Sequence, residues 1–269
     1  MPPHSPITAF ALAARVHDDV LDLEALAVAI ARMGNPALTG ATVHQALNAL
    51  AEQVADRVDL GAPPDRLAAR LSLTLGTELD FRGDPSAPPS AEASYLDRVL
   101  ETRRGLPILL STVWILVGAR LGIPIRGVGY PGHFLVCLDA PGARVFLDPF
   151  HGGNQRDGTE LLARLGPGTG ARRLLDPCDT RALVTRILVN LKHLWVGQSD
   201  FVNALGAVDR ILLIGGEQPV ELRDRGLICL HLDRPAEASR DFQKYLKARP
   251  EADDRPVIEA LLEKISGAT

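Results

Sequence analysis

The sequence lacks several features that would place it in a class at once. Only 4% of its 269 residues are aromatic, and its three cysteines, Cys137, Cys178 and Cys229, neither pair off evenly nor form a CxxC motif. Few aromatics argue against a base-stacking platform for nucleic acid, and unpaired cysteines indicate a reduced compartment. No run approaches the ~20 apolar residues that a membrane span requires. We therefore expect a cytoplasmic protein with no membrane partner.

Concentrated positive charge is also missing. The net charge is −4, and the lysines and arginines are scattered among acids. Binding to a phosphate backbone usually leaves a basic face, so we expect no nucleic-acid partner. The seven histidines are dispersed, and no HExxH, phosphate loop or dinucleotide fingerprint is present. The sequence accordingly predicts neither a metal nor a cofactor, and the Gly152-Gly153 pair is interpreted as a tight turn.

Residues 1–93 are expected to form a helical N-terminal region that is part of the core domain. The run ITAFALAARV has no basic residues ahead of it and is too short for a signal core, so it is interpreted as an amphipathic helix. Apolar residues recur at helical spacing in three further segments. These are Asp22–Arg32, Ala41–Val58 and Pro64–Leu79.

Residues 94–180 are expected to form an α+β core. A helix over 95–104 is expected to end at Gly105 in a left-handed stop, and Pro107 suits the first turn of the next helix. Residues 108–121 are apolar nearly all round, which indicates a helix buried on most sides. Three strands are expected to follow in a small antiparallel sheet against this helix. They are Ile125–Gly129, His133–Leu138 and Arg144–Asp148.

Residues 186–266 predict an all-α repeat segment. The stretches 186–219 and 220–253 can be aligned at an offset of 34 residues, and Gly226, Ala238, Phe242 and Pro250 fit tetratricopeptide spacing. The first repeat is degenerate, because Lys192 stands where glycine is usual. Two repeats are too few to stand alone, so a capping helix over 255–265 is expected to complete them.

Two polar residues at the ends of the predicted strands carry the chemistry. If residues 139–142 form the loop of the hairpin, Leu138 pairs with Ala143 and His133 falls opposite Asp148. Directly opposed β-carbons lie roughly 5 Å apart, which allows the carboxylate to orient the imidazole. Pro141 fits more than one turn type, so a shift of one or two residues stays open. Taken alone, the pair is best interpreted as a structural tie between strands.

A nucleophile for this pair is hard to find. Cysteine enzymes place the thiol at a helix start, where amide dipoles lower its pKa, but here Leu109 is the third helical residue. Ser111 lies deeper in the helix, and its first interpretation is a small residue at a tight helix–sheet contact. Cys137 is four residues from His133 on one strand, or about 13 Å away, which is too far for a nucleophile and its base.

Three stretches of the sequence together resemble a known family. They are YLDRVLETRRGLPILLS, LGIPIRGVGYPGHFLV and LDPFHGG. The chain resembles, over about residues 20–253, the SirB-type branch of the transglutaminase-like superfamily, whose members often carry a helical N-terminal region and tetratricopeptide repeats. The resemblance implies a papain-like core with a Cys–His–Asp triad. His133 and Asp148 match the histidine and aspartate, whereas the cysteine position falls near Leu109.

Three functions follow from these observations. In the favoured one, a catalytically degenerate core binds a peptide or protein in a cleft between helix and hairpin, lined by Tyr130, Trp114, Phe150 and His151. The alternative is a hydrolase of amides or esters that uses Ser111, His133 and Asp148. In the third, the chain is a scaffold that acts through its repeats. The oligomeric state stays open.

Overall fold

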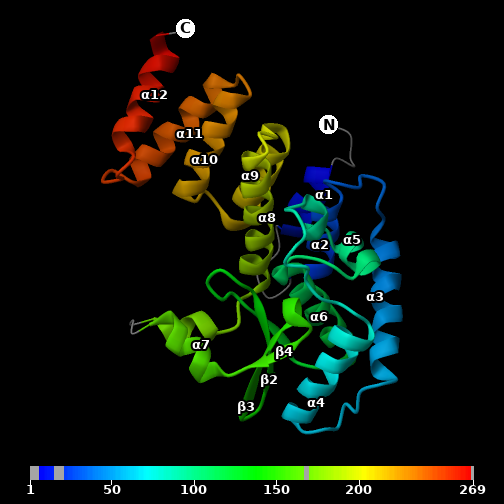
Figure 1. The fold of residues 1–269 in the computed structure, drawn as a ribbon. Helices are drawn as coiled ribbons and strands as arrows, with labels where there is room; N and C mark the ends of the chain where they lie inside the picture. The colour runs from blue at the N-terminus through cyan, green and yellow to red at the C-terminus, as the bar shows by residue number, and fades with distance from the viewer. Residues whose placement is uncertain (1–5, 15–20, 167–169, 268–269) are drawn as a thin grey trace. The chain divides into compact units, whose positions relative to one another are not determined.

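The computed structural model describes residues 6–14, 21–166 and 170–267 of the chain (Figure 1). The chain divides into two compact units. The core unit is Val16–Ile187, and the repeat unit combines Met1–Arg15 with Leu188–Thr269. Among the described residues, no single helix is long and apolar enough to cross a membrane. Within that part of the chain, one pair of helices, α5 (Leu96–Thr102) and α6 (Pro107–Leu121), meets those limits when taken together, and the pair is bent by 85°.

Helices dominate the first half of the core unit. Asp22 starts the first of them, because its carboxylate accepts the N–H of Ala25 at 3.0 Å. The predicted helix 64–79 is α-helical only to Leu71 and continues as a π-helix. The helical elements are α2 (Leu23–Ala31), α3 (Gly40–Ala55), α4 (Pro64–Leu71), the π-helix η2 (Ser72–Glu78), the 3-10 helix η3 (Ala91–Ser94), α5 (Leu96–Thr102) and α6 (Pro107–Leu121).

The stop of α5 differs from the prediction. Arg103 takes the left-handed conformation with φ 59°, and its guanidinium donates to the carbonyl of Leu79 at 3.0 Å. Gly105 has another role: a Cβ at this position would lie 2.7 Å from the side chain of Val99. This glycine therefore permits close packing of the chain on α5, and the bound arginine supplies the turn.

Helix α6 forms as predicted, and ten of its fifteen residues are buried. It begins at Pro107 and ends at Gly122, which is left-handed with φ 69°. Gly118 lets α6 approach the sheet closely, since a Cβ there would meet the side chain of Ile125 at 2.9 Å. Helix α6 packs on β1 and β2 (Figure 1).

The sheet is antiparallel with four strands in the order β1-β2-β3-β4. Its strands are β1 (Ile125–Val128), β2 (Leu135–Ala140), β3 (Ala143–Asp148) and β4 (Asn154–Arg156). The α+β class and the small antiparallel sheet are confirmed. The predicted register is wrong by two residues, because Ala140 pairs with Ala143 around a tight turn at Pro141-Gly142. Strand β2 starts at Leu135, and β4 was not predicted.

Two different layers cover the two faces of the sheet. Side chains alternate along a strand, so Leu135 and Cys137 of β2 share the face of Phe146 on β3. These three pack in one buried cluster with Leu161 of α7 (Gly158–Leu165) and Leu175 of the 3-10 helix η5 (Ala171–Leu175). We call this the α7 face. The opposite set of side chains, which includes Ile125, faces α6.

The N-terminal helix groups with the repeats. Residues 1–93 were expected to be part of the core domain, but α1 (Pro6–Ala14) belongs to the repeat unit and contacts α9 (Phe201–Gly215). The reason is apolar burial: Phe10 has no exposed surface, and the guanidinium of Arg210 lies 5.9 Å from the centre of its ring.

The repeat unit reproduces the predicted offset of 34 residues. Phe201 begins α9 and Pro235 begins the corresponding helix of the second repeat. A Cβ on Gly226 would lie 2.5 Å from the ring of Phe242, so the glycine permits the helix pair to touch. The remaining helices are α8 (Thr180–Gly197), α10 (Pro219–His231), α11 (Pro235–Ala248) and α12 (Arg255–Gly267).

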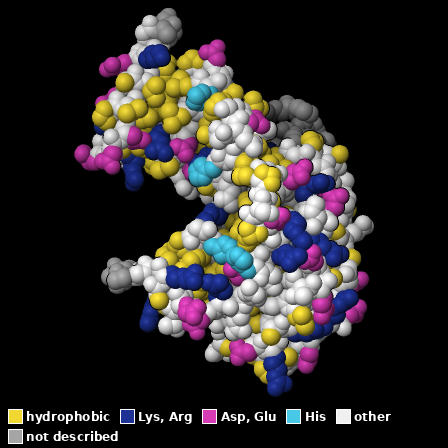
Figure 2. All heavy atoms as spheres, in the orientation of Figure 1, with side chains coloured by type: hydrophobic (Ala, Val, Ile, Leu, Met, Phe, Trp, Pro, Cys, Tyr) yellow, Lys and Arg dark blue, Asp and Glu magenta, His cyan; other side chains and the backbone are white. Residues whose placement is uncertain are grey.

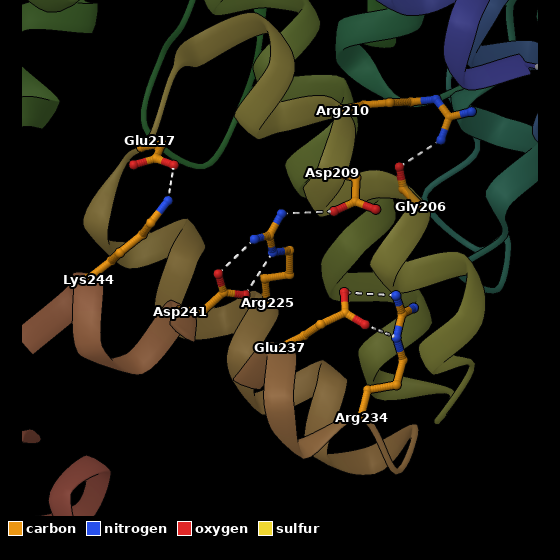
Figure 3. Close-up of polar contacts among 9 residues, drawn as sticks. All are labelled: Gly206, Asp209, Arg210, Glu217, Arg225, Arg234, Glu237, Asp241 and Lys244. Atoms are coloured by element: carbon orange, nitrogen blue, oxygen red, sulfur yellow. Dashed lines mark hydrogen bonds and ion pairs between the residues drawn. The ribbon is translucent and has the colours of Figure 1, made fainter. Parts of the chain in front are cut away.

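Ion pairs join the repeats. Figure 3 shows Arg225 of α10 reaching toward α9 and α11: it binds both carboxylate oxygens of Asp241, at 2.6 and 2.8 Å, and one of Asp209 at 3.2 Å. Lys192, at the degenerate glycine position, is buried on α8. Its ammonium lies 2.8 Å from Glu221 and 2.7 Å from Asp224. The lysine therefore replaces close packing by a buried ion pair.

Lys192→Met tests this replacement. Removing the ammonium leaves Glu221 partly buried without its cation, so we expect a loss of about 3–5 kcal/mol in the free energy of unfolding. Urea denaturation followed by circular dichroism measures the loss. Lys247→Met, on α11, is the control and should change stability by less than about 0.5 kcal/mol. Equal stability of the two variants would contradict the role assigned to Lys192.

Candidate functional site

Asp148 is the centre of the candidate site. It ends β3, and it is 2% exposed. Its Oδ1 lies 2.8 Å from Nε2 of His133, and its Oδ2 lies 2.9 Å from Nδ1 of His151. The backbone N–H of His151 also donates to Oδ1 at 3.3 Å. One buried carboxylate thus holds two imidazoles in fixed orientations.

The loop before β2 positions His133. Its backbone N–H donates to the carbonyl of Tyr130 at 3.0 Å, and Gly132 takes a left-handed turn with φ 71°. The structure brings His133 and Asp148 into contact although the predicted register was wrong. His133 lies in the loop before β2, and this loop brings its imidazole to Asp148 although the two residues do not pair across the strands.

A 3-10 turn positions His151. The turn η4 (Pro149–His151) is followed by two left-handed glycines, Gly152 and Gly153. Their N–H groups donate to the carbonyls of Pro149 and Asp148, at 3.2 and 2.7 Å. The glycine pair is therefore a tight turn, as interpreted from the sequence, and its amides are not free to bind an anion.

The environment of Asp148 keeps it ionised. Burial raises the pKa of this carboxyl, but the hydrogen bonds and charges of His133 and His151 outweigh burial and hold the pKa below its ordinary value. Each histidine uses one ring nitrogen for this contact. Within the described residues, Nδ1 of His133 has no hydrogen-bond partner, so it remains available to a ligand.

A cavity of about 320 Å³ opens beside this carboxylate. Leu135, Asp148 and Leu161 are among its walls, which places it on the α7 face of the sheet. No residue of α6 lines it, so it is not the predicted cleft between helix and hairpin. The full lining is Tyr130, Pro131, Gly132, His133, Leu135, Asp148, His151, Arg156, Leu161 and Arg164.

Two of the four predicted lining residues do not line this cavity. Tyr130 and His151 line the cavity, but Trp114 is fully buried on α6, where a Cβ on Gly153 would lie 2.6 Å from its ring. Phe150 instead packs edge-on against His133, with ring centres 5.9 Å apart. Its ring also covers Gly83. Phe150 therefore supports the imidazole from outside the cavity.

The helix start offers no exposed nucleophile. Leu109 is 1% exposed at the third position of α6, and Ser111 has no exposed surface. The hydroxyl of Ser111 has no hydrogen-bond partner in the described part of the chain, so it does not contact His133. A nucleophilic serine needs a base in contact. The structure thus joins His133 to Asp148 and leaves Ser111 apart from them.

The three thiols are poor candidates as well. Burial raises the pKa of Cys137, Cys178 and Cys229 to about 11 in each case. At neutral pH such thiols stay protonated, and the protonated form is a weak nucleophile. For Cys137 this agrees with its exclusion as a nucleophile by its distance from His133 along the strand.

The structure also contains a cluster with metal-ligand chemistry that was not predicted. His133, Asp148 and His151 can offer one ligand atom each, and these atoms lie within 4.8 Å of one another. Two imidazoles and a carboxylate suit a transition metal. In such sites the second nitrogen of each histidine usually donates to an acceptor, and among the described residues neither histidine has one. The arrangement fits a hydrogen-bonded triad better than a metal site.

Arg156 and Arg164 were also missed. Both line the cavity, one from β4 and the other from α7. The strand β4 has three residues, too few for a periodic signal. Nothing in the sequence shows that α7 folds over the same face of the sheet as Asp148.

Comparison with known families agrees with this architecture. The transglutaminase-like superfamily matches residues 41–189, which is more than half of the chain, and a tetratricopeptide repeat family matches residues 191–263. The chain belongs to the transglutaminase-like superfamily. The resemblance inferred from the sequence is confirmed.

Individual relatives narrow the assignment. A UPF0162 protein of Xylella fastidiosa (strain 9a5c) is 33% identical over 94% of this chain and 93% of its own length. A UPF0162 protein of Vibrio cholerae is 30% identical over 64% of this chain and 66% of its own. Protein SirB1 of Salmonella typhimurium is 25% identical over 75% and 77%, respectively. These relatives support the SirB-type branch.

Asp148→Asn tests the central contact. Because the pKa of Asp148 is lower in the folded than in the unfolded chain, its stabilisation is present above about pH 4 and is lost as the pH falls through the folded pKa. At pH 7 we expect the variant to lose about 1–3 kcal/mol. Urea denaturation should show this gap from wild type shrinking below about pH 4.

The control for this measurement is Asp176→Asn. Asp176 is exposed, and its ion pair with Arg144 is long at 3.4 Å. We expect its substitution to cost under about 0.5 kcal/mol at every pH. A gap for Asp148→Asn that widens as the pH falls below about 4 would contradict the assigned direction.

Ser111→Ala separates packing from catalysis. A buried hydroxyl without a partner is destabilising, so its removal should leave stability unchanged or raise it by up to about 1 kcal/mol. Thr112→Val is the matched control, since the Thr112 hydroxyl donates to the carbonyl of Ile108 at 2.8 Å. The control should lose about 0.5–1.5 kcal/mol. Ester hydrolysis by wild type that disappears in Ser111→Ala would overturn this assignment.

Proposed function

We propose that this protein is a peptide- or protein-binding module with a degenerate transglutaminase-like core, and that the cavity beside Asp148 is its ligand site. The observation that carries the proposal is an open cavity next to a histidine–carboxylate pair, with Leu109 buried where the family resemblance places the cysteine. A hydrophobic residue at that position does not impair binding. Among the described residues, the imidazole of His133 has no nucleophile in contact that it could activate.

The composition of the cavity supports recognition. Ligand sites combine apolar walls with a few fixed polar groups, and Leu135 and Leu161 stand here beside His133 and His151. Asp148 holds both imidazoles, so they lose little freedom when a ligand binds. A site that is already ordered can bind a ligand without a large conformational change.

The repeat unit supports a role in protein interaction. Tetratricopeptide repeats expose helix faces that bind other chains, and the family match extends over residues 191–263. A second cavity, of about 520 Å³, lies within this unit and is lined by residues that include Val220, Arg223 and Tyr245. We propose that the repeats contribute a binding surface of their own.

A hydrolase that uses Ser111 has less support. Such an enzyme needs the serine within about 3 Å of a histidine nitrogen and open to solvent. Ser111 is fully buried, and its hydroxyl has no partner within the described residues.

The test is selection of peptides from a random displayed library on the full chain, followed by fluorescence anisotropy with selected peptides. His133→Ala should weaken binding at least about tenfold, because the histidine lines the cavity. His193→Ala, an exposed histidine of α8, is the control and should bind like wild type. Circular dichroism of each variant verifies its fold.

Val220→Glu decides between the two surfaces. Val220 is 43% exposed at the start of α10, where an acidic residue is tolerated. Binding that survives Val220→Glu and is lost in His133→Ala supports the core cavity. The reverse pattern would contradict the core cavity as the ligand site and assign the ligand to the repeats, and failure of the full chain to select any peptide would contradict both.

A further inference from the structure

The cavity beside Asp148 has more positive charge than its own walls neutralise. Two arginines line it, Arg156 and Arg164, against one carboxylate, Asp148. That carboxylate already binds both histidines. Figure 2 shows His side chains next to Lys or Arg side chains and hydrophobic ones on this face of the molecule. In the described part of the chain, neither arginine forms an ion pair or a side-chain hydrogen bond.

Nearby carboxylates are directed elsewhere. Asp157 follows Arg156 in sequence, but its side chain caps α7 and accepts the N–H groups of Thr159 and Glu160 at 2.6 and 3.2 Å. Glu160 lies one turn before Arg164 on the same helix, yet no ion pair within 4.0 Å joins them. The two guanidinium groups therefore remain available to an acceptor from outside the chain.

The rest of the cavity is apolar. Leu135 and Leu161 are 1% and 3% exposed and belong to the buried cluster under the α7 face. Tyr130 directs its hydroxyl to the carbonyl of Leu161 at 3.0 Å, so its polar atom is satisfied by the protein. A volume of about 320 Å³ suits one amino-acid residue or a small molecule. The cavity thus places two guanidinium groups beside an apolar surface, the floor, which Leu135 and Leu161 form.

We propose that this cavity binds the free C-terminal carboxylate of a peptide whose last side chain is apolar. The inference rests on the proposed function and names the group that the site recognises. Guanidinium groups bind carboxylates in a two-pronged geometry that an amide does not reproduce, and Leu135 and Leu161 accept the apolar side chain. Phosphate would leave that floor unused, and two arginines beside the histidines oppose a metal ion.

The experiment compares two pools of labelled hexapeptides that end in leucine, one with a free acid and one with a C-terminal amide. Fluorescence anisotropy with the full chain measures their affinity. We expect the acid pool to bind at least about tenfold more tightly, because the amide loses charge-assisted hydrogen bonds. This comparison needs no variant and is independent of any effect on folding.

Variants then locate the carboxylate. Arg156→Gln and Arg164→Gln should each weaken binding of the acid pool about tenfold or more and reduce the difference between acid and amide. Arg66→Gln is the control, since Arg66 is an exposed arginine of α4 outside the cavity. N-acetyl-leucine should displace the acid pool, whereas N-acetyl-leucinamide should not.

The outcomes separate the two proposals. If acid and amide bind alike and both are weakened by His133→Ala, the proposed function stands and the C-terminal carboxylate is excluded. Absence of binding by either pool and by library peptides would overturn both. Displacement by inorganic phosphate as effective as by N-acetyl-leucine, or loss of binding on adding EDTA, would replace the carboxylate by an inorganic anion or a metal and overturn the inference.

Discussion

The local structure of the core unit depends on keeping the carboxylate of Asp148 ionised while it is buried. A buried charge without compensation is costly, and here the compensation comes from two imidazoles and a backbone N–H. Three segments must therefore converge on one side chain: the loop before β2, the end of β3 and the turn η4. The cavity exists because these segments meet at the edge of the sheet and α7 covers the adjoining face.

The two faces of the sheet explain why the cavity beside Asp148 is separated from helix α6. Strand alternation gives Leu135 and Phe146 to the α7 face, and the cavity opens there. Helix α6 packs on the other side, with Gly118 against Ile125. Ser111 and Trp114 are buried on that helix, and each has a polar atom without a partner in the described residues. The polar atoms of α6 therefore serve neither the cavity nor the imidazoles.

Much of the fold could be predicted because local signals were strong. Pro107 and Gly122 mark the start and the end of α6, and the 34-residue offset predicted where corresponding repeat helices begin. The features that were predicted wrongly or not at all share a cause, because each depends on contacts between segments far apart in the sequence. The hairpin register followed from the turn at Pro141-Gly142, which admits several pairings. The cavity required α7 and β4 to fold onto one face, and no local pattern encodes that.

The contact between His133 and Asp148 was predicted correctly although the predicted register of the hairpin was wrong. A loop can bring a histidine to a carboxylate whether or not the two residues pair across strands, so the contact tolerates a shift that the strand positions do not. The partners of the same site could not be found in this way. Arg156 and Arg164 have no special local sequence, and they stand out only because no carboxylate of the described residues forms an ion pair with either. Two imidazoles held by Asp148, and two guanidiniums without an ion pair among the described residues, are the features on which the proposed binding of a carboxylate rests.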